Sequence, residues 1–128
     1  MKELIEHIEA LLLTNDCVII PDFGGFIAFN TPAKWVEEES LFVPPIRTVG
    51  FNPQLKLNDG LIVQAYMSAY GTTFPDASKR VNKATRQLKR WLMAEGRVEL
   101  QGLGTLRVSM DGSYHFVPFI DGLNSPTL

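Results

Sequence analysis

The clearest pattern of hydrophobic and polar positions begins at Pro75 and continues to the residue before Gly96. Apolar residues recur there at helical spacing and, at about 100° per residue, share one face: Ala77, Val81, Ala84, Leu88, Trp91 and Leu92. Thr72 or Thr73 is a suitable N-cap. Gly96 is a suitable end because glycine adopts positive φ without steric cost. The pattern predicts a long amphipathic helix.

The N-terminal half of the chain predicts a shorter helix followed by strands. A helix ending near Thr14 is indicated by apolar residues at helical spacing: Leu4, Ile5, Ile8, Leu11 and Leu12. Residues 18–20 and 26–29 are predicted as strands joined by a glycine turn. Residues 42–44 are predicted as the third strand. Residues 46–57 are expected to be extended or turning, because residues before proline avoid the helical region.

The C-terminal half predicts a similar order of elements. Residues 61–70 are expected to form a helix capped by Asn58 or Asp59 and stopped by Gly71. The long helix follows, and residues 98–106 then form an apolar segment punctuated by glycine. Asp111-Gly112 is a strong turn signal that predicts a tight hairpin before the last strand.

The two halves match each other at a fixed offset of 80 residues. Ile8 falls on Leu88, Val18 on Val98, and the run Phe23-Gly24-Gly25-Phe26 on Leu103-Gly104-Thr105-Leu106. Phe42-Val43-Pro44 then recurs as Phe116-Val117-Pro118 at the shorter offset of 74 residues. Two copies of one helix–strand–strand–strand unit are predicted, and units this short are expected to share a core.

The segment Gly102-Leu103-Gly104-Thr105-Leu106, placed after an amphipathic helix, resembles the Gly-Phe-Gly-Thr-Phe hairpin of the HU/IHF family. Residues 59–119 are similar to nearly a whole HU subunit, and residues 2–58 are similar to one from its second helix onward. The tandem order and the run from Gly50 to Leu55 further resemble divergent bacterial tandem HU-like domains. In that class they form the N-terminal part of envelope proteins that end in a peptidoglycan-binding SPOR domain.

The resemblance implies an α+β fold with two tandem HU-like units, each with helices and a three-stranded antiparallel sheet. The two units would share one core as a pseudo-dimer within the chain, with Leu11, Trp91, Phe26 and Leu106 buried. The expected boundaries are 1–58 for a truncated first unit and 59–120 for the second. Residues 121–128 are expected to be a linker-like tail because Gly, Asn, Ser, Pro and Thr predominate there.

Composition places the chain among globular proteins. It has 128 residues, of which 45% are hydrophobic and 20% charged, enough for one good core. The single cysteine, Cys17, excludes an internal disulfide and is expected to be a structural thiol in a reducing compartment. No apolar run of about 18 residues occurs, so no membrane contact is expected from this segment. A cytoplasmic location is predicted, including as the cytoplasmic part of a membrane-anchored envelope protein.

The candidate catalytic residues do not form any recognisable set. His7 and His115 belong to different copies, and no Ser/His/Asp, paired-carboxylate or metal-ligand spacing accompanies them. We therefore expect no enzymatic activity, no metal, no cofactor and no small-molecule substrate.

The charge distribution is uneven. A net charge of −2 and a pI near 5.6 are unusual for a simple nucleic-acid binder. However, residues 78–91 contain six Lys or Arg residues and no acid. Binding to DNA phosphates with little sequence preference would depend on cations in this segment: Lys79, Lys83, Arg86, Lys89 and Arg90.

Residues 30–40 form a connection that the second copy lacks, at the place where HU-like proteins have their DNA-clasping arm. The basic Arg-Asn-Pro tip of that arm is absent, and Glu37-Glu38-Glu39 would repel phosphates. Lys34 and Trp35 are the candidate arm contacts. Packing over the sheet is the expected role of Trp35, with an exposed partner anchor as the alternative.

Two functions remain at this point. The resemblance favours a nucleoid-associated DNA-binding module that could tether DNA to the cell envelope. The acidic total and the altered arm favour a scaffold for protein–protein interaction that has lost DNA binding. The predicted partners are therefore double-stranded DNA or a protein.

Overall fold

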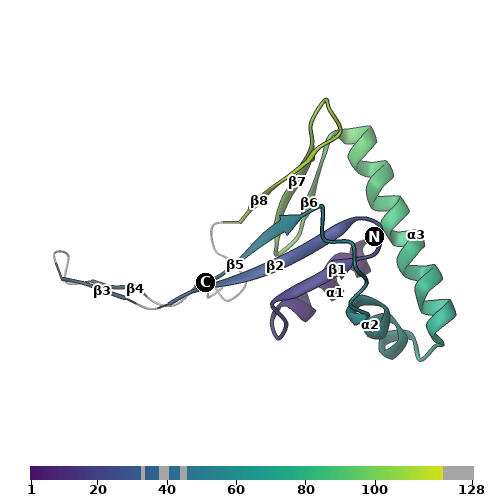
Figure 1. The fold of residues 1–128 in the computed structure, drawn as a ribbon, viewed down its shortest axis with the longest axis horizontal. Helices are drawn as coiled ribbons and strands as arrows, with labels where there is room; N and C mark the ends of the chain where they lie inside the picture. The colour runs from purple at the N-terminus through teal and green to yellow at the C-terminus, as the bar shows by residue number, and fades with distance from the viewer. Residues whose placement is uncertain (33, 38–40, 44–45, 120–128) are drawn as a thin grey trace.

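The computed structural model describes residues 1–32, 34–37, 41–43 and 46–119. Figure 1 shows a mixed α+β fold in which three helices pack beside two sheets and a narrow hairpin projects from one of them. The elements are α1 (Lys2–Leu12), β1 (Cys17–Ile20), β2 (Gly24–Thr31), β3 (Lys34–Val36), β4 (Leu41–Val43), β5 (Ile46–Asn52), α2 (Leu61–Tyr70), α3 (Phe74–Glu95), β6 (Arg97–Leu100), β7 (Gly104–Val108) and β8 (Tyr114–Pro118).

Each half of the chain builds an antiparallel sheet of three strands. The first has the order β1-β2-β5 and the second the order β6-β7-β8. In both sheets the first two strands are joined by the predicted glycine hairpin. Ile20 pairs with Gly24 in the first, and Leu100 pairs with Gly104 in the second. The two units predicted from the sequence are therefore confirmed.

The two units share one hydrophobic core. Ile8, Phe26 and Val18 of the first unit belong to the same buried cluster as Leu88, Leu106 and Val98 of the second. Aromatic rings join the sheets, since the Phe26 and Phe116 ring centroids lie 5.9 Å apart. Successive side chains point to opposite faces of a strand, and in β6 the buried Val98 and Leu100 alternate with exposed residues. The prediction of an intrachain pseudo-dimer is confirmed.

Contacts between the units are reciprocal, as a twofold relation requires. Lys89 of α3 pairs with Asp22 at the first glycine turn, where its Nζ lies 3.1 Å from Oδ2. The residues equivalent by the offset of 80, Glu9 and Gly102, are also in contact, because a side chain at Gly102 would collide with the Glu9 carboxylate. Asp22 and Gly102 both have positive φ, of 64° and 84°.

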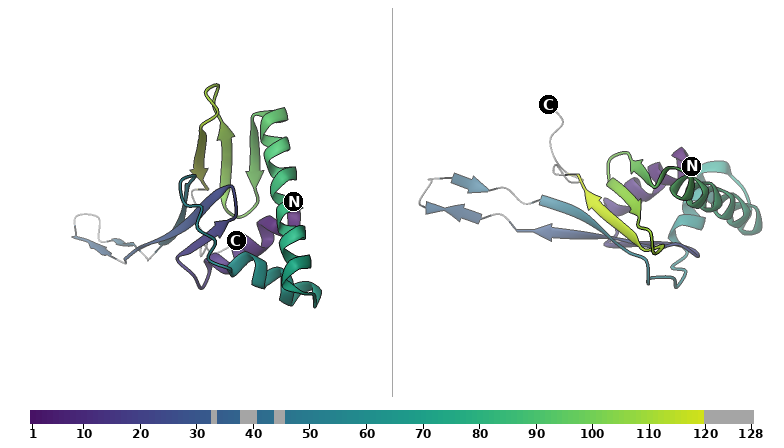
Figure 2. Two further views of the ribbon diagram at one scale, coloured as in Figure 1. Left: turned by 45° about the vertical axis from the view of Figure 1, so that its right-hand side comes forward. Right: turned by 90° about the horizontal axis from the view of Figure 1, so that it is seen from above.

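The connection in the first unit forms the projecting hairpin, which we call the arm. Strands β3 and β4 pair antiparallel, with Trp35 opposite Phe42. They continue in the direction of β2 and β5 and extend away from the rest of the molecule (Figures 1 and 2). In the second unit a short turn joins β7 to β8, and the Ser109 amide donates to the Ser113 carbonyl at 2.9 Å. The predicted tight hairpin is confirmed.

The third strand of the first unit was placed incorrectly by the sequence. Phe42-Val43-Pro44 does not correspond to Phe116-Val117-Pro118, because β4 lies on the arm. The counterpart of β8 is β5, in which Phe51 faces Phe26 as Phe116 faces Leu106. Residues 46–52, which were expected to be extended or turning but were not assigned to a strand, form this strand. Pro44-Pro45, Glu38, Glu39 and the tail at 121–128 lie outside the described residues.

Two expectations about burial and capping are also corrected. Trp91 was expected in the core but is 51% exposed, and Leu11 is only partly buried at the edge of the core. Helix α2 begins after Gly60 without a side-chain cap, since Asn58 and Asp59 instead accept from Gly60 and Leu61 amides in local turns. Phe26 and Leu106 are fully buried, as predicted.

Candidate nucleic-acid interface

Helix α3 presents the basic residues along one exposed face. Thr73 caps its start by accepting from the Asp76 amide, and Gly96 ends it with φ of 77°. Its apolar face is buried, so positions between the apolar ones must face solvent. Four exposed cations repeat at three- or four-residue spacing, and we call them the α3 stripe: Lys79, Lys83, Arg86 and Arg90.

The remaining two cations of α3 are engaged by carboxylates. Arg80 Nε lies 2.8 Å from Asp76 Oδ2, and its guanidinium sits 4.5 Å from the centre of the Tyr70 ring. This arginine, followed by the Thr72 hydroxyl, lowers the pKa of Asp76. Lys89, a candidate DNA contact, is half-buried and pairs with Asp22. Within the described part of the chain, the α3 stripe forms no ion pair, so its charge is available to a ligand.

A second basic set lies on the sheet β6-β7-β8. The register places Arg97 opposite Arg107, and Arg107 opposite His115, so the three side chains form a row across the sheet. All three are exposed, on the face opposite the buried Val98 and Leu106. We call them the sheet row. Sequence reasoning missed it, although strand alternation and the glycine hairpin together imply that Arg97 and Arg107 are paired.

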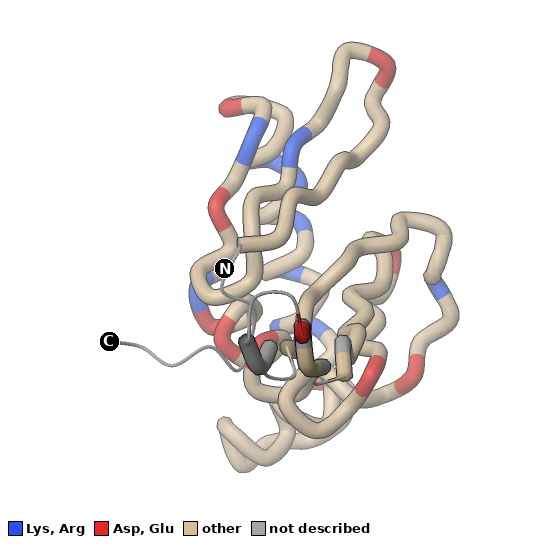
Figure 3. The backbone as a smooth tube through the Cα atoms, turned by 90° about the vertical axis from the view of Figure 1, so that its left-hand side faces the viewer, with Lys and Arg blue, Asp and Glu red and all other residues tan. Residues whose placement is uncertain are grey.

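Most of the positive charge therefore lies in the second unit. Eight of the 12 Lys and Arg residues belong to α3, β6 and β7. Figure 3 shows the blue Lys and Arg positions along the backbone, with several following α3. The first unit contributes only four Lys and Arg residues, and the side chain of one of these, Arg47, is buried.

The arm has an exposed aromatic residue. Trp35 is 57% exposed, so the expectation that it packs over the sheet is wrong and the alternative of an exposed ring is the observed one. Lys34 lies next to it in β3, opposite Val43 in the backbone register. Glu37, the described member of the acidic run, is also exposed.

The other chemically reactive side chains are dispersed. Cys17 is partly buried, and burial followed by the nearby Asp59 carboxylate raises the pKa of its thiol, as expected of an unreactive structural cysteine. His7 stacks near Tyr66 with ring centroids 4.9 Å apart, whereas His115 lies in the second sheet. Among residues with described positions, no group of three or more His, Cys, Asp or Glu could hold a metal ion.

Comparison with known families agrees with this arrangement. Residues 1–59 match the family described as CCDC81-like prokaryotic HU domain 1, and residues 60–127 match CCDC81-like prokaryotic HU domain 2. The chain belongs to the CCDC81-like prokaryotic HU domains. The tandem HU resemblance is thereby confirmed. HU domains are a DNA-binding fold family and are typically non-enzymatic. No curated protein and no solved structure matches this HU pair.

None of the helices in the described ranges is long and apolar enough to cross a membrane.

Proposed function

We propose that this HU pair binds double-stranded DNA through phosphate contacts and with little sequence preference. The observation that supports this most directly is the α3 stripe, in which four exposed cations share one face without a carboxylate partner in the described structure. Phosphates dominate the affinity of most DNA-binding proteins, and cations that are not already paired need not first break an ion pair. The residues proposed to contact DNA are Lys79, Lys83, Arg86 and Arg90. Lys89 could contact a phosphate only if its ion pair with Asp22 breaks.

The dimensions of the α3 stripe suit a phosphate backbone. From Lys79 to Arg90 the helix rises about 16 Å, at about 1.5 Å per residue. One strand of a duplex presents a phosphate roughly every 3.4 Å of axis, so the stripe could span several consecutive phosphates. The stripe consists of Lys and Arg, whose charges attract phosphates next to any base, which supports binding that is largely indifferent to sequence.

The sheet row is a second phosphate-contact surface in this proposal. HU-like proteins hold DNA mainly with their sheets and arms, and the sheet row lies on the outer face of a sheet. With strands about 4.8 Å apart, the three side chains span roughly 10 Å across that face. Lys34 and Trp35 on the arm are proposed as secondary contacts. A role as a nucleoid-associated module that tethers DNA to the envelope from the cytoplasmic side extends the same proposal.

The test is a DNA titration with two matched double variants. Lys83→Gln with Arg86→Gln removes the centre of the α3 stripe, and Arg97→Gln with Arg107→Gln removes the guanidinium groups of the sheet row. Binding of a duplex by fluorescence anisotropy should weaken with salt, with a log–log slope of about −0.9 per phosphate neutralised. The first variant should reduce the magnitude of that slope by about 2 and weaken all duplex sequences equally.

The control for these variants is Lys56→Gln with Lys2→Gln, which removes the same charge from the first unit. Circular dichroism should show the same unfolding midpoint for all three proteins, because every altered side chain is exposed. Absence of duplex binding at low salt and about 0.1 mM protein would reject the proposal, because non-specific Kd values are at most about 0.1 mM even at physiological salt. If the α3 stripe variant and the control lost the same DNA affinity, the α3 stripe would not be the binding surface.

A scaffold for protein contacts is the alternative function, and one observation favours it. Negative charge is concentrated in the first unit, where Glu6 and Glu9 of α1 and Glu37 of the arm are not paired with cations in the described structure. A surface of this sign would repel phosphates and attract a basic protein. A folded protein that binds no duplex DNA in the titration above would support the scaffold function.

A further inference from the structure

Helix α2 fills a defined place beside the first sheet and α3. Its buried residues Ile62, Val63 and Tyr66 belong to the common core. The turn before it adds a polar contact, because Asp59 Oδ2 accepts from the Ile19 amide at 3.1 Å. Strand β1 is an edge strand, so this amide points away from the sheet. Helix α2 thus both covers apolar surface and satisfies an edge donor.

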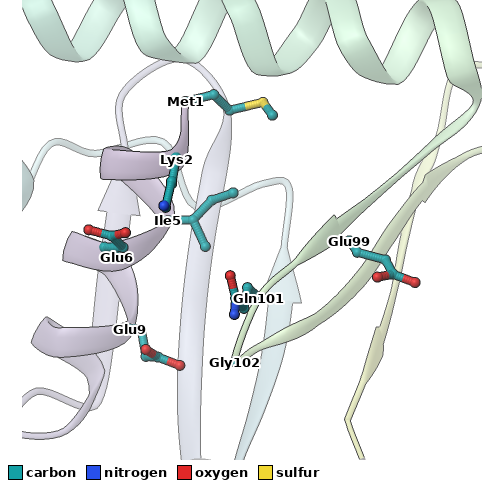
Figure 4. Close-up of a pocket in the computed structure, with 8 residues that line it drawn as sticks. All are labelled: Met1, Lys2, Ile5, Glu6, Glu9, Glu99, Gln101 and Gly102. Carbon is teal, nitrogen blue, oxygen red and sulfur yellow. The ribbon is translucent and has the colours of Figure 1, made fainter.

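Because the two units are equivalent at an offset of 80 residues, the position of α2 has an equivalent position on the other side of the pseudo-dimer. It relates β1 to β6 and the second half of α3 to α1, so the equivalent place lies between α1, β6 and α3. The structure has a cleft of about 860 Å³ there, bounded by α1 on one side and the β6 strand on the other (Figure 4). In the described parts of the chain, no helix occupies it.

The unpaired backbone amide of the edge strand is also repeated in the second sheet. Glu99 in β6 is equivalent to Ile19, since Glu99 pairs with Thr105 as Ile19 pairs with Gly25. The flanking bonds agree, because Val108 donates to Gly96 at 3.0 Å just as Ala28 donates to Asp16 at 2.8 Å. The Glu99 amide therefore points away from the sheet and into the cleft region. Among described side chains, none accepts from it, whereas Asp59 accepts from Ile19.

The chemistry of the cleft indicates what would fill it. Met1 and Ile5 provide an apolar wall, and Trp91 of α3 lines an adjoining hollow of about 430 Å³. Three carboxylates line the main cleft, those of Glu6, Glu9 and Glu99, and the cations that line it are the Lys2 ammonium group and the amino terminus at Met1. An occupant must therefore be apolar on one side and positively charged on its flanks.

We propose that this cleft docks a basic amphipathic helix of a partner protein, in the place that α2 occupies in the other half of the fold. The helix would bring a side-chain acceptor at its start to the Glu99 amide and apolar residues to Met1, Ile5 and Trp91. The inference does not depend on DNA binding, because none of its residues belongs to the sheet row and only Arg90, at the edge of the adjoining hollow, belongs to the α3 stripe.

The probe is a peptide copied from residues 58–71, because this segment fills the equivalent place. Asp59→Asn keeps an acceptor without adding charge, and Gln64→Lys and Ser68→Lys alter two exposed positions of the helix. A control peptide has the same sequence with Glu at those two positions. Labelled protein of residues 1–128 is titrated with each peptide and followed by amide NMR, with Trp91 fluorescence measured in a Trp35→Phe background.

The basic peptide should shift the amide signals of Glu99 and Gly102 and the fluorescence of Trp91. The acidic peptide should bind at least about ten-fold more weakly, because its flanks face carboxylates. In the protein, Glu6→Gln with Glu99→Gln should raise the Kd for the basic peptide by about ten-fold while keeping the Glu99 backbone donor. Glu37→Gln on the arm, a matched loss of exposed charge, should leave it unchanged. The Lys83→Gln, Arg86→Gln variant should also bind the peptide normally.

Three results would overturn the proposal. One is no shift at Glu99 or Trp91 with about 1 mM basic peptide, a concentration at which even weak specific binding is visible. Another is equal affinity for the two peptides. The third is a shift of the same signals with protein concentration alone, together with a dimer in sedimentation, which would make a second copy of this chain the occupant.

Discussion

The two sheets present different chemistry at equivalent positions of the same register. In the second sheet the row across the outer face is Arg97, Arg107 and His115. In the first sheet the equivalent row is Cys17, Ile27 and Gly50, which has no charged side chain. The buried faces, in contrast, are apolar in both. The outer residues of this row are not part of the shared core, so they are free to differ in function.

The units differ in the same way at their hairpins. The first extends β2 and β5 into the arm, whereas the second closes β7 and β8 with a short turn stabilised by Ser109, Asp111 and Ser113. Both connections join the second strand of their sheet to the third. The comparison indicates a common core with an arm and an open cleft associated with the first unit and a cationic surface on the second. Substitutions at equivalent positions of the two units test how far the equivalence extends.

The largest effect is expected in the shared core. Ile8 and Leu88 occupy equivalent positions, and neither side chain is accessible to solvent. Ile8→Ala and Leu88→Ala should each lower the free energy of unfolding by about 2 to 5 kcal/mol, because each leaves a cavity. Urea unfolding should show one transition in both variants. Leu13→Ala, at an exposed position, is the control. Two separate transitions, or an unchanged midpoint, would contradict a single core.

Arg47 should be the next most sensitive position, and only in the first unit. Its buried guanidinium donates to the Leu12 and Asn15 carbonyls, at 2.8 and 2.9 Å, and fixes the end of α1 to β5 at the base of the arm. Arg47→Met should cost on the order of 3 kcal/mol, because buried carbonyls lose their donors. Asp16→Asn should cost less than about 1 kcal/mol, since the side chain of Asp16 is 83% exposed. Similar losses in both would show that the ion pair, not the carbonyl contacts, matters.

Gly24 and Gly104 are equivalent but have different neighbours. A Cβ at Gly104 would lie 2.3 Å from the Val117 carbonyl oxygen, which is backbone and cannot move without displacing β8. At Gly24 the nearest atoms belong to the Phe51 ring. Gly104→Ala should cost about 1 to 3 kcal/mol by overpacking. Gly24→Ala should be destabilising for a different reason, because its φ of 158° is rarely adopted by residues with a side chain. Thermal unfolding of the two variants, measured side by side, tests both losses; an unchanged Tm for Gly104→Ala would show that β8 can move to make room.

The smallest effect concerns the turn of the second unit in acid. The Ser109 hydroxyl, followed by the Ser113 amide, donates to Asp111 and lowers its pKa to about 2. A lowered pKa means that the contribution to stability is present above the unfolded value of about 4 and is lost as pH falls toward 2. The difference in Tm between the protein and Asp111→Ala should therefore shrink over that interval. A difference that stays constant would show that ionisation of Asp111 does not matter.

The sequence predicted those features that depend on local spacing. The long helix with its threonine cap and Gly96 end and both glycine hairpins follow from residues close together in the chain, and the offset of 80 follows from comparing two such local patterns. The third strand of the first unit was misplaced because the arm separates β5 from β2, and strand pairing across such a connection is not encoded in local periodicity. Trp91 was expected inside because helical phase alone cannot show whether another element covers that side of α3.

What the sequence by itself determined is the repeat and the faces of its elements, because backbone geometry fixes side-chain directions at 3.6 residues per helical turn and two per strand repeat. Tertiary structure alone decided which cations are free. Lys89 meets Asp22 only because the units pack reciprocally, and Arg97, Arg107 and His115 form a row only because three strands align. The cleft beside α1 has the same origin: it exists because the fold repeats the place of α2 without, in the described residues, repeating the helix.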